Sequence, residues 1–193
     1  MLTALEKLRQ GTYDPASGQI RWWTYYDRAI MAAATLEHTY FAVPKGQGGK
    51  TLADTNMPNA ALMPQGHNFE IHAIEAFYVA DGAKTQAEYQ NVIDMMRDTY
   101  LQFEIEALAN QLQLPIQVLF GNPMPQVVTG AAAGDQVTSR AQYKGMWELP
   151  VPIVLAAETS WRITMTHTVA VNASLADDEL MISLVGALVS MGG

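Results

Sequence analysis

Three clusters of polar residues in this 193-residue chain have types and spacings that suit chemistry. The first runs from Gly46 to Thr51, GQGGKT, and follows an apolar stretch as a phosphate-binding loop does. That pattern requires glycine at position 44, but Pro44 stands there and has no N–H to offer a phosphate. The following residues include Pro58 and Pro64 where the pattern requires a helix. We interpret the run as a glycine-rich hairpin turn with exposed lysines.

The second cluster joins His67, Glu70 and His72, with His167 as a further nitrogen, and is typical of metal sites on β-barrels. Two histidines must point the same way to share an ion, which on a strand requires an even separation. His67 and His72 are five residues apart, so on a regular strand they face opposite sides. Glu70 and His72 share a face, but it is the polar face. We expect surface or interface residues and no metal.

The third cluster is the acidic run from Asp177 to Glu179, whose carboxylates suit calcium. It precedes an apolar strand, so a solvated turn is the interpretation we favour over calcium ligation. The chain has no cysteine, which excludes disulfides, thiolate zinc sites and a cysteine nucleophile. It also has no Gly-x-Ser-x-Gly motif. We therefore predict a protein that is not an enzyme, with no catalytic residue, no metal and no cofactor.

Composition narrows the classes of partner. The chain has 11 basic and 19 acidic residues, a net charge of −8, and the basic residues are scattered, which argues against sequence-specific nucleic-acid binding. The longest uncharged apolar stretch, 180–193, is shorter than the ~20 residues of a membrane-spanning helix. We interpret it as a buried strand. Residues 1–10 lack the apolar core of a signal peptide and have the spacing of a short amphipathic helix.

The elements that must position these residues are mostly strands. Alternating apolar and polar residues predict strands rather than helices through much of the chain. The predicted strands are 19–26 (or a peripheral arm), 68–80, 100–107, 114–120, 161–171 and 180–189. Residues 85–97 predict a helix, because Thr85 and Glu88 form a capping-box pattern ahead of a buried apolar stripe. Residues 27–37 suit either a second short helix or a connection between strands. We expect a mainly β fold, a jelly-roll-like antiparallel β-sandwich with one or two short helices.

The order of the later segments carries a family resemblance. The proline-bearing segment ELPVPIVL at 148–155 leads through the small-residue turn AAETS to WRITM at 161–165, and DELMISLVG at 178–186 closes the chain. This layout resembles the single-jelly-roll capsid proteins of tailless icosahedral viruses, in particular those of bacteria. FAVP at 41–44 and FEI at 69–71 resemble the entry into the first sheet. The resemblance spans about residues 37 to 189 and concerns layout rather than any residue motif.

That resemblance implies a structural virion protein, assembled in the host cytoplasm from copies of itself and other capsid proteins, with no transmembrane segment. We assign residues 1–28 to an N-terminal arm or helix and 29–193 to one jelly-roll domain. The aromatic residues before the sandwich are candidate interface anchors, because large aromatic side chains dominate many interfaces. They are Trp22, Trp23, Tyr25 and Tyr26. The alternative is a non-viral β-sandwich binding module with a carbohydrate or protein ligand.

Overall fold

The computed structural model describes residues 19–82, 84–106, 108–120 and 142–190. In these residues eight strands form two antiparallel sheets, accompanied by two α-helices and one 3-10 turn. The elements are β1 (Gln19–Ile30), β2 (Glu37–Tyr40), β3 (His67–Val79), α2 (Gln86–Arg97), β4 (Thr99–Ile105), β5 (Leu108–Pro115), α3 (Gln117–Phe120), β6 (Gln142–Leu155), β7 (Trp161–His167), η2 (Ala173–Leu175) and β8 (Glu179–Ser190).

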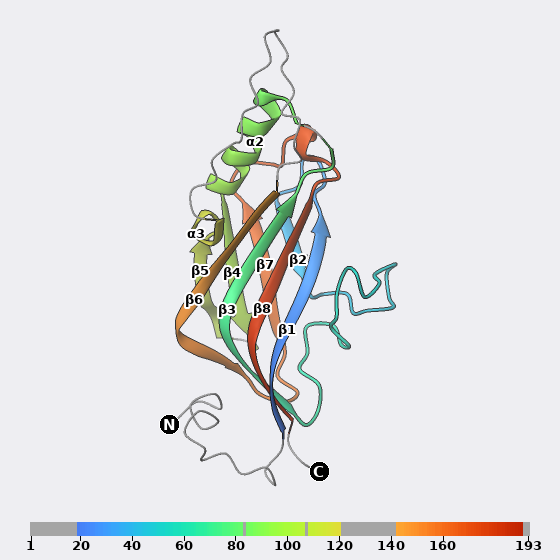
Figure 1. The fold of residues 1–193 in the computed structure, drawn as a ribbon, viewed down its shortest axis with the longest axis vertical. Helices are drawn as coiled ribbons and strands as arrows, with labels where there is room; N and C mark the ends of the chain where they lie inside the picture. Colours follow the sequence, from blue (N-terminus) through green and yellow to red (C-terminus); the bar gives the residue numbers. More distant parts are fainter. Residues whose placement is uncertain (1–18, 83, 107, 121–141, 191–193) are drawn as a thin grey trace.

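The strand order is that of a jelly roll. The sheets have the orders β1-β8-β3-β6 and β2-β7-β4-β5 (Figure 1). The first strand pairs with the last, the second with the seventh, the third with the sixth and the fourth with the fifth. One long antiparallel hairpin rolled upon itself produces this pairing, which is the jelly-roll arrangement. The predicted mainly β sandwich with short helices is confirmed.

The core lies between the two sheets and is built by alternation along the strands. In β4 the buried side chains of Leu101 and Phe103 alternate with the less buried Gln102 and Glu104. Side chains from both sheets meet in one apolar cluster that also includes the inner face of α2. This agrees with the predicted alternation at 100–107 and requires that each sheet have one inner and one outer face.

A β-bulge in β3 changes which residues face the core. Ile71 pairs with Gly186 of β8, but the next register pair is Ala73 with Val185, so His72 is an extra residue. Before the bulge Phe69 and Ile71 point inward, and after it Ile74, Ala76 and Tyr78 do so. Inserting one residue shifts the two-residue period by one. The bulge therefore explains why the apolar residues of 68–80 change face near Ile74.

The sandwich begins earlier than the sequence suggested. Residues 19–28 were assigned to an arm, yet β1 pairs with β8 along its whole length, from Gln19 opposite Ser190 to Ile30 opposite Glu179. Of the two predictions for 19–26, a strand packed on its own sheet is the one that the structure shows. The remainder of the predicted arm, residues 1–18, lies outside the described residues.

Two other local predictions can be compared with the structure. The helix at 85–97 is confirmed with its capping box: Glu88 N donates to Thr85 Oγ1, and Thr85 N donates to Glu88 Oε2 at 2.7 Å. The predicted strand 114–120 is wrong, because β5 ends at Pro115 and Gln117–Phe120 form the short helix α3. Residues 31–36 connect β1 to β2 rather than form a helix.

Candidate functional site

The two outer faces of the sandwich differ in polarity. On the β2-β7-β4-β5 sheet, residues that share the outer face are mostly polar or charged, as expected for an antiparallel sheet that meets water on one side. They are Glu37, Thr39, Tyr100, Gln102, Glu104, Gln113, Arg162, Thr164 and Thr166. This sheet follows the normal pattern of an apolar inner face and a polar outer face.

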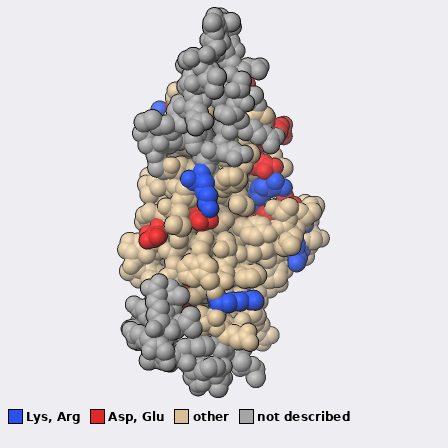
Figure 2. All heavy atoms as spheres, in the orientation of Figure 1, with Lys and Arg blue, Asp and Glu red and all other residues tan. Residues whose placement is uncertain are grey.

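The outer face of the β1-β8-β3-β6 sheet carries large apolar side chains among charged ones such as Glu75, Lys144 and Glu148, and we call it the apolar face to distinguish it from the other. The register places Trp22, Ala187, Glu70 and Val154 side by side in one row across all four strands. Neighbouring rows add further apolar side chains. They are Ala73, Phe77, Val79, Met146, Met181 and Val185. Figure 2 views the molecule from the side of this sheet and shows uncharged side chains over much of it, with several Lys or Arg and Asp or Glu side chains among them.

The edge strands hold the most exposed apolar side chains of this face. Trp22 on β1 is 55% exposed, and Met146 and Val154 on β6 are 50% and 55% exposed. The central residues are small or buried, with Ala187 and Ser183 0% and 4% exposed. Trp22 and Met146 therefore lie on either side of a central strip that has little exposed surface. The exposed apolar side chains therefore stand at the two edges of the sheet, with Glu70 and Glu75 of the central strand β3 between them.

The four predicted interface residues divide between the two faces of β1. Trp22 points outward and packs on the imidazole of His72, with ring centroids 5.8 Å apart. Tyr26 also points outward, and its hydroxyl donates to the backbone oxygen of Leu52. Trp23 and Tyr25 point inward against the core, where Tyr25 meets Phe69 edge to face with centroids 5.0 Å apart. Trp22 is thus the predicted residue that remains available to a partner.

The histidines of the second cluster lie apart from one another. His72 Nε2 lies 3.6 Å from a Glu70 carboxylate oxygen on the apolar face, whereas His67 Nδ1 contacts the backbone oxygen of Gln65. His167 belongs to the other sheet and faces His38 in the interior. Among the residues that the structure describes, no group of three or more His, Cys, Asp or Glu side chains is placed to hold a metal ion.

The glycine-rich run is a turn, as predicted, but Lys50 is not an exposed lysine. Gly46, Gly48 and Gly49 have positive φ angles, which a glycine adopts without steric cost. The Lys50 ammonium pairs with the buried carboxylate of Asp27 and donates to the backbone oxygen of Arg28 at 3.1 Å. Burial raises the pKa of Asp27, and the hydrogen bond from Lys50 opposes that rise.

Arg28 lies beside the same turn and is also paired. Its guanidinium contacts Asp54 and lies 2.8 Å from Glu179. The Thr51 backbone N–H and the Arg28 guanidinium lower the pKa of Asp54 to about 2. A cavity of about 380 Å³ lies here, lined by Arg28, Lys50 and Asp54 among others. Because both cations already contact carboxylates, the cavity does not present the unpaired positive charge that a phosphate site needs.

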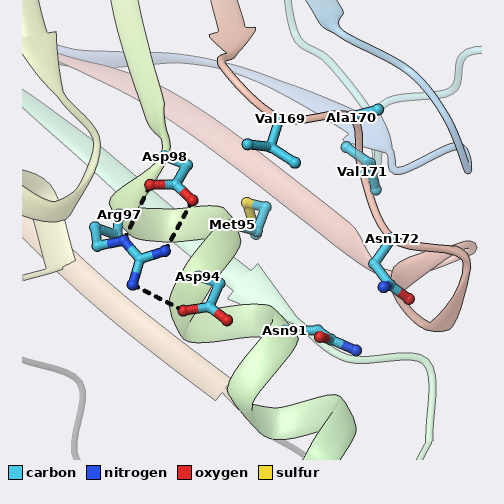
Figure 3. A pocket seen from close by; sticks show the side chains of 9 residues that line it. All are labelled: Asn91, Asp94, Met95, Arg97, Asp98, Val169, Ala170, Val171 and Asn172. Carbon is cyan, nitrogen blue, oxygen red and sulfur yellow. Dashed lines mark hydrogen bonds and ion pairs between the residues drawn. The ribbon is translucent and has the colours of Figure 1, made fainter.

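Figure 3 shows a second cavity, of about 220 Å³, between the C-terminal half of α2 and the segment that follows β7. Arg97 lies between the carboxylates of Asp94 and Asp98, at 3.0 and 2.9 Å. Asn91 donates to Ser174 Oγ, and Asn172 accepts from the backbone N–H of Ser174. The polar lining is therefore used in holding α2 and η2 in place, and it includes no arrangement of acid, base and nucleophile.

The acidic run is not the solvated turn that the sequence suggested. Asp177 is exposed, but the Asp178 side chain is fully buried. Its carboxylate accepts from the Tyr78 hydroxyl and from the Asp81 backbone N–H, and lies 2.8 Å from the Lys84 ammonium. Lys84 also donates to the backbone oxygen of Ser174 at 2.6 Å. The network therefore ties β8 to β3 and to the start of α2.

Comparison with known proteins adds no family: no family model matches the chain, and the search of curated proteins found no match. Within the described residues, none of the helices combines the length and the apolar character needed to cross a membrane.

Proposed function

We propose that this protein is a structural virion protein, a capsid subunit that assembles with copies of itself and with other capsid proteins in the host cytoplasm. The observation that carries the proposal is the contrast between the two outer faces. The β1-β8-β3-β6 sheet carries large apolar side chains on its outer face as well as on its inner one, and its own core covers the inner face alone. Covering the apolar face with neighbouring subunits removes that area from water, and the polar face stays solvated.

The jelly-roll strand order supports this proposal, because many viral capsid subunits have that architecture. Fold alone does not decide function, so the apolar face carries the argument. The paired cations of the Lys50 turn and the paired lining of the α2 cavity offer no competing catalytic arrangement. The net charge of −8 also disfavours direct packaging contacts with nucleic acid.

The proposal is tested by measuring particle size. The purified protein, examined by light scattering and negative-stain microscopy, is expected to form closed particles or their capsomers. The substitutions Trp22→Ser and Val154→Ser on the apolar face should abolish the larger species and leave the subunit folded. Val169→Ser is a matched control, because Val169 is 65% exposed but lies outside both sheets.

Two outcomes would contradict the proposal. One is a protein that stays monomeric at every concentration. The other is assembly that Val169→Ser reduces as much as Val154→Ser does. A monomer whose melting temperature rises with an added carbohydrate or peptide would instead favour a β-sandwich binding module, with the 220 Å³ cavity beside α2 as its first candidate site.

A further inference from the structure

We propose that two copies of this subunit pack with their apolar faces together, across a two-fold axis that passes between their Met146 side chains. This inference rests on the assembly role proposed above and specifies one contact within it. The partner that binds the apolar face is then a second copy of the chain. Charge complementarity along β6 is the observation that selects this occupant.

Strand β6 carries opposite charges on either side of Met146. Lys144, Met146 and Glu148 alternate along the strand and point to the outer face, where they lie opposite Phe77, Glu75 and Ala73 of β3. The Lys144 side chain is 64% exposed and lies 3.7 Å from Glu75. Glu148 is also exposed. A cation and an anion therefore stand two residues before and two residues after an exposed methionine.

Within one subunit Lys144 and Glu148 do not meet, because four residues along a strand span about 13 Å. Consider a two-fold axis that lies between the two packed sheets, runs perpendicular to β6 and passes between the two Met146 side chains. This axis reverses the direction of β6 in the second copy. Lys144 of each copy then lies opposite Glu148 of the other, so two ion pairs form at once. Glu75 shares the row of Met146 and lies opposite its own copy, where the Lys144 ammonium 3.7 Å away in each subunit offsets the repulsion. This is the self-complementarity that an isologous interface requires.

On the central strands β3 and β8, the same operation matches large side chains with smaller ones. The row that contains Met181 and Phe77 falls over the row that contains Val185 and Ala73. Phe77 then meets Ala73 of the other copy, and Met181 meets Val185. Sheets packed face to face lie about 10 Å apart, a gap that such pairs of unequal side chains fill.

The first test uses the absence of cysteine from the chain. In the full-length variant Met146→Cys, the only thiol lies at the proposed axis. A bis-maleimide with a span of about 10 Å, which suits the spacing of packed sheets, should convert most of the protein into a covalent dimer. The control Thr39→Cys places the thiol on the polar face and should give little dimer. Equal yields from both variants, or no dimer from Met146→Cys, would overturn the proposal.

The second test exchanges the charges. Lys144→Glu and Glu148→Lys should each weaken self-association by about tenfold or more in analytical ultracentrifugation, because each brings like charges together twice. The double variant Lys144→Glu/Glu148→Lys should recover the wild-type association constant. Arg162→Glu is a control on the polar face. It changes the net charge by the same amount as Lys144→Glu and should have little effect on self-association. A double variant as weak as the single variants would disprove this axis.

The two proposals fail in different ways. If particles form but Met146→Cys gives no cross-linked dimer and the charge exchange does not recover association, the capsid role stands and the two-fold contact is wrong. If the wild-type chain forms neither dimers nor particles, both are wrong. A melting temperature for each variant identifies any that fails to fold, and the cross-linking result then decides alone.

Discussion

His38 and His167 pack edge to face in the interior, with ring centroids 5.3 Å apart, and the described residues offer no hydrogen-bond partner to either Nε2 atom. The Thr99 hydroxyl donates to the backbone oxygen of Met95, so its oxygen accepts from His167 Nδ1 at 2.7 Å. We assign the proton of His167 to Nδ1 on this ground, which leaves an unpaired lone pair on Nε2.

This pair predicts loss of stability in acid. Burial, with a smaller contribution from His38, lowers the pKa of His167 to about 4, and burial also lowers the pKa of His38. Between pH 6.5 and 4 the unfolded chain binds more protons at these sites than the folded chain, so the free energy of unfolding falls as the pH falls. His167 alone contributes about 3 kcal/mol to that fall.

The measurement is urea denaturation from pH 7.5 to 4, with His167→Asn as the test variant. The asparagine amide can still donate to Thr99 but does not titrate in this range. We expect the variant to lose less stability than the wild type over the interval. Parallel curves for the two proteins would show that His167 is not buried in its neutral form.

The hydrogen bonds and the ion pair of Asp178 predict that removing this one charge lowers folding stability strongly. Asp178→Asn leaves the Lys84 ammonium buried without its anion, which should cost about 3–5 kcal/mol of folding stability. Asp177→Asn changes the neighbouring exposed residue and should cost less than about 0.5 kcal/mol. Chemical denaturation compares the two directly. Similar effects from both would mean that Asp178 is solvated, as its sequence context suggested.

Sequence reasoning succeeded where a pattern is local. The alternation at 100–107 and the capping box at Thr85 each depend on residues within one element, and both are confirmed in the structure. It failed where the deciding partner is distant in the chain. Nothing in the run from Asp177 to Glu179 distinguishes a carboxylate that will be buried against Lys84 from two that stay near water.

The site was only partly predictable for a similar reason. Trp22 was identified because it is a large aromatic residue, but Tyr25 was included although Phe69, on strand β3 of the same sheet, packs against its ring in the core. The apolar face itself left a signal, since 68–80 is apolar on both faces beyond Ile74. Recognising that signal as a second surface required the His72 bulge, because the bulge decides which residues face the core.

The close contact between α3 and Gly145 of β6 gives a third prediction. A Cβ atom on Gly145 of β6 would lie 1.4 Å from the backbone oxygen of Leu119 in α3, so the helix sits directly on the glycine. Gly145→Ala must displace α3 or bend β6, and should destabilise the fold by about 1–3 kcal/mol or more. Thermal melting measures the loss. An unchanged melting temperature would mean that α3 does not rest against β6.

The two faces of β1 give the last prediction, because Trp22 and Tyr25 are similar in size but differ in what surrounds them. Tyr25→Ala removes a buried ring from its edge-to-face contact with Phe69, and should cost about 3–5 kcal/mol of folding stability. Trp22→Ala removes a ring that is more than half exposed, so the subunit should lose about 1–2 kcal/mol, less than with Tyr25→Ala. Assembly should respond in the opposite order if, as we propose, Trp22 is the one that contacts a neighbouring subunit. Melting temperature and particle yield, measured on the same two preparations, separate the roles. If Trp22→Ala lowers the melting temperature as much as Tyr25→Ala does and leaves the particle yield unchanged, Trp22 stabilises its own subunit and the apolar face has lost its principal anchor.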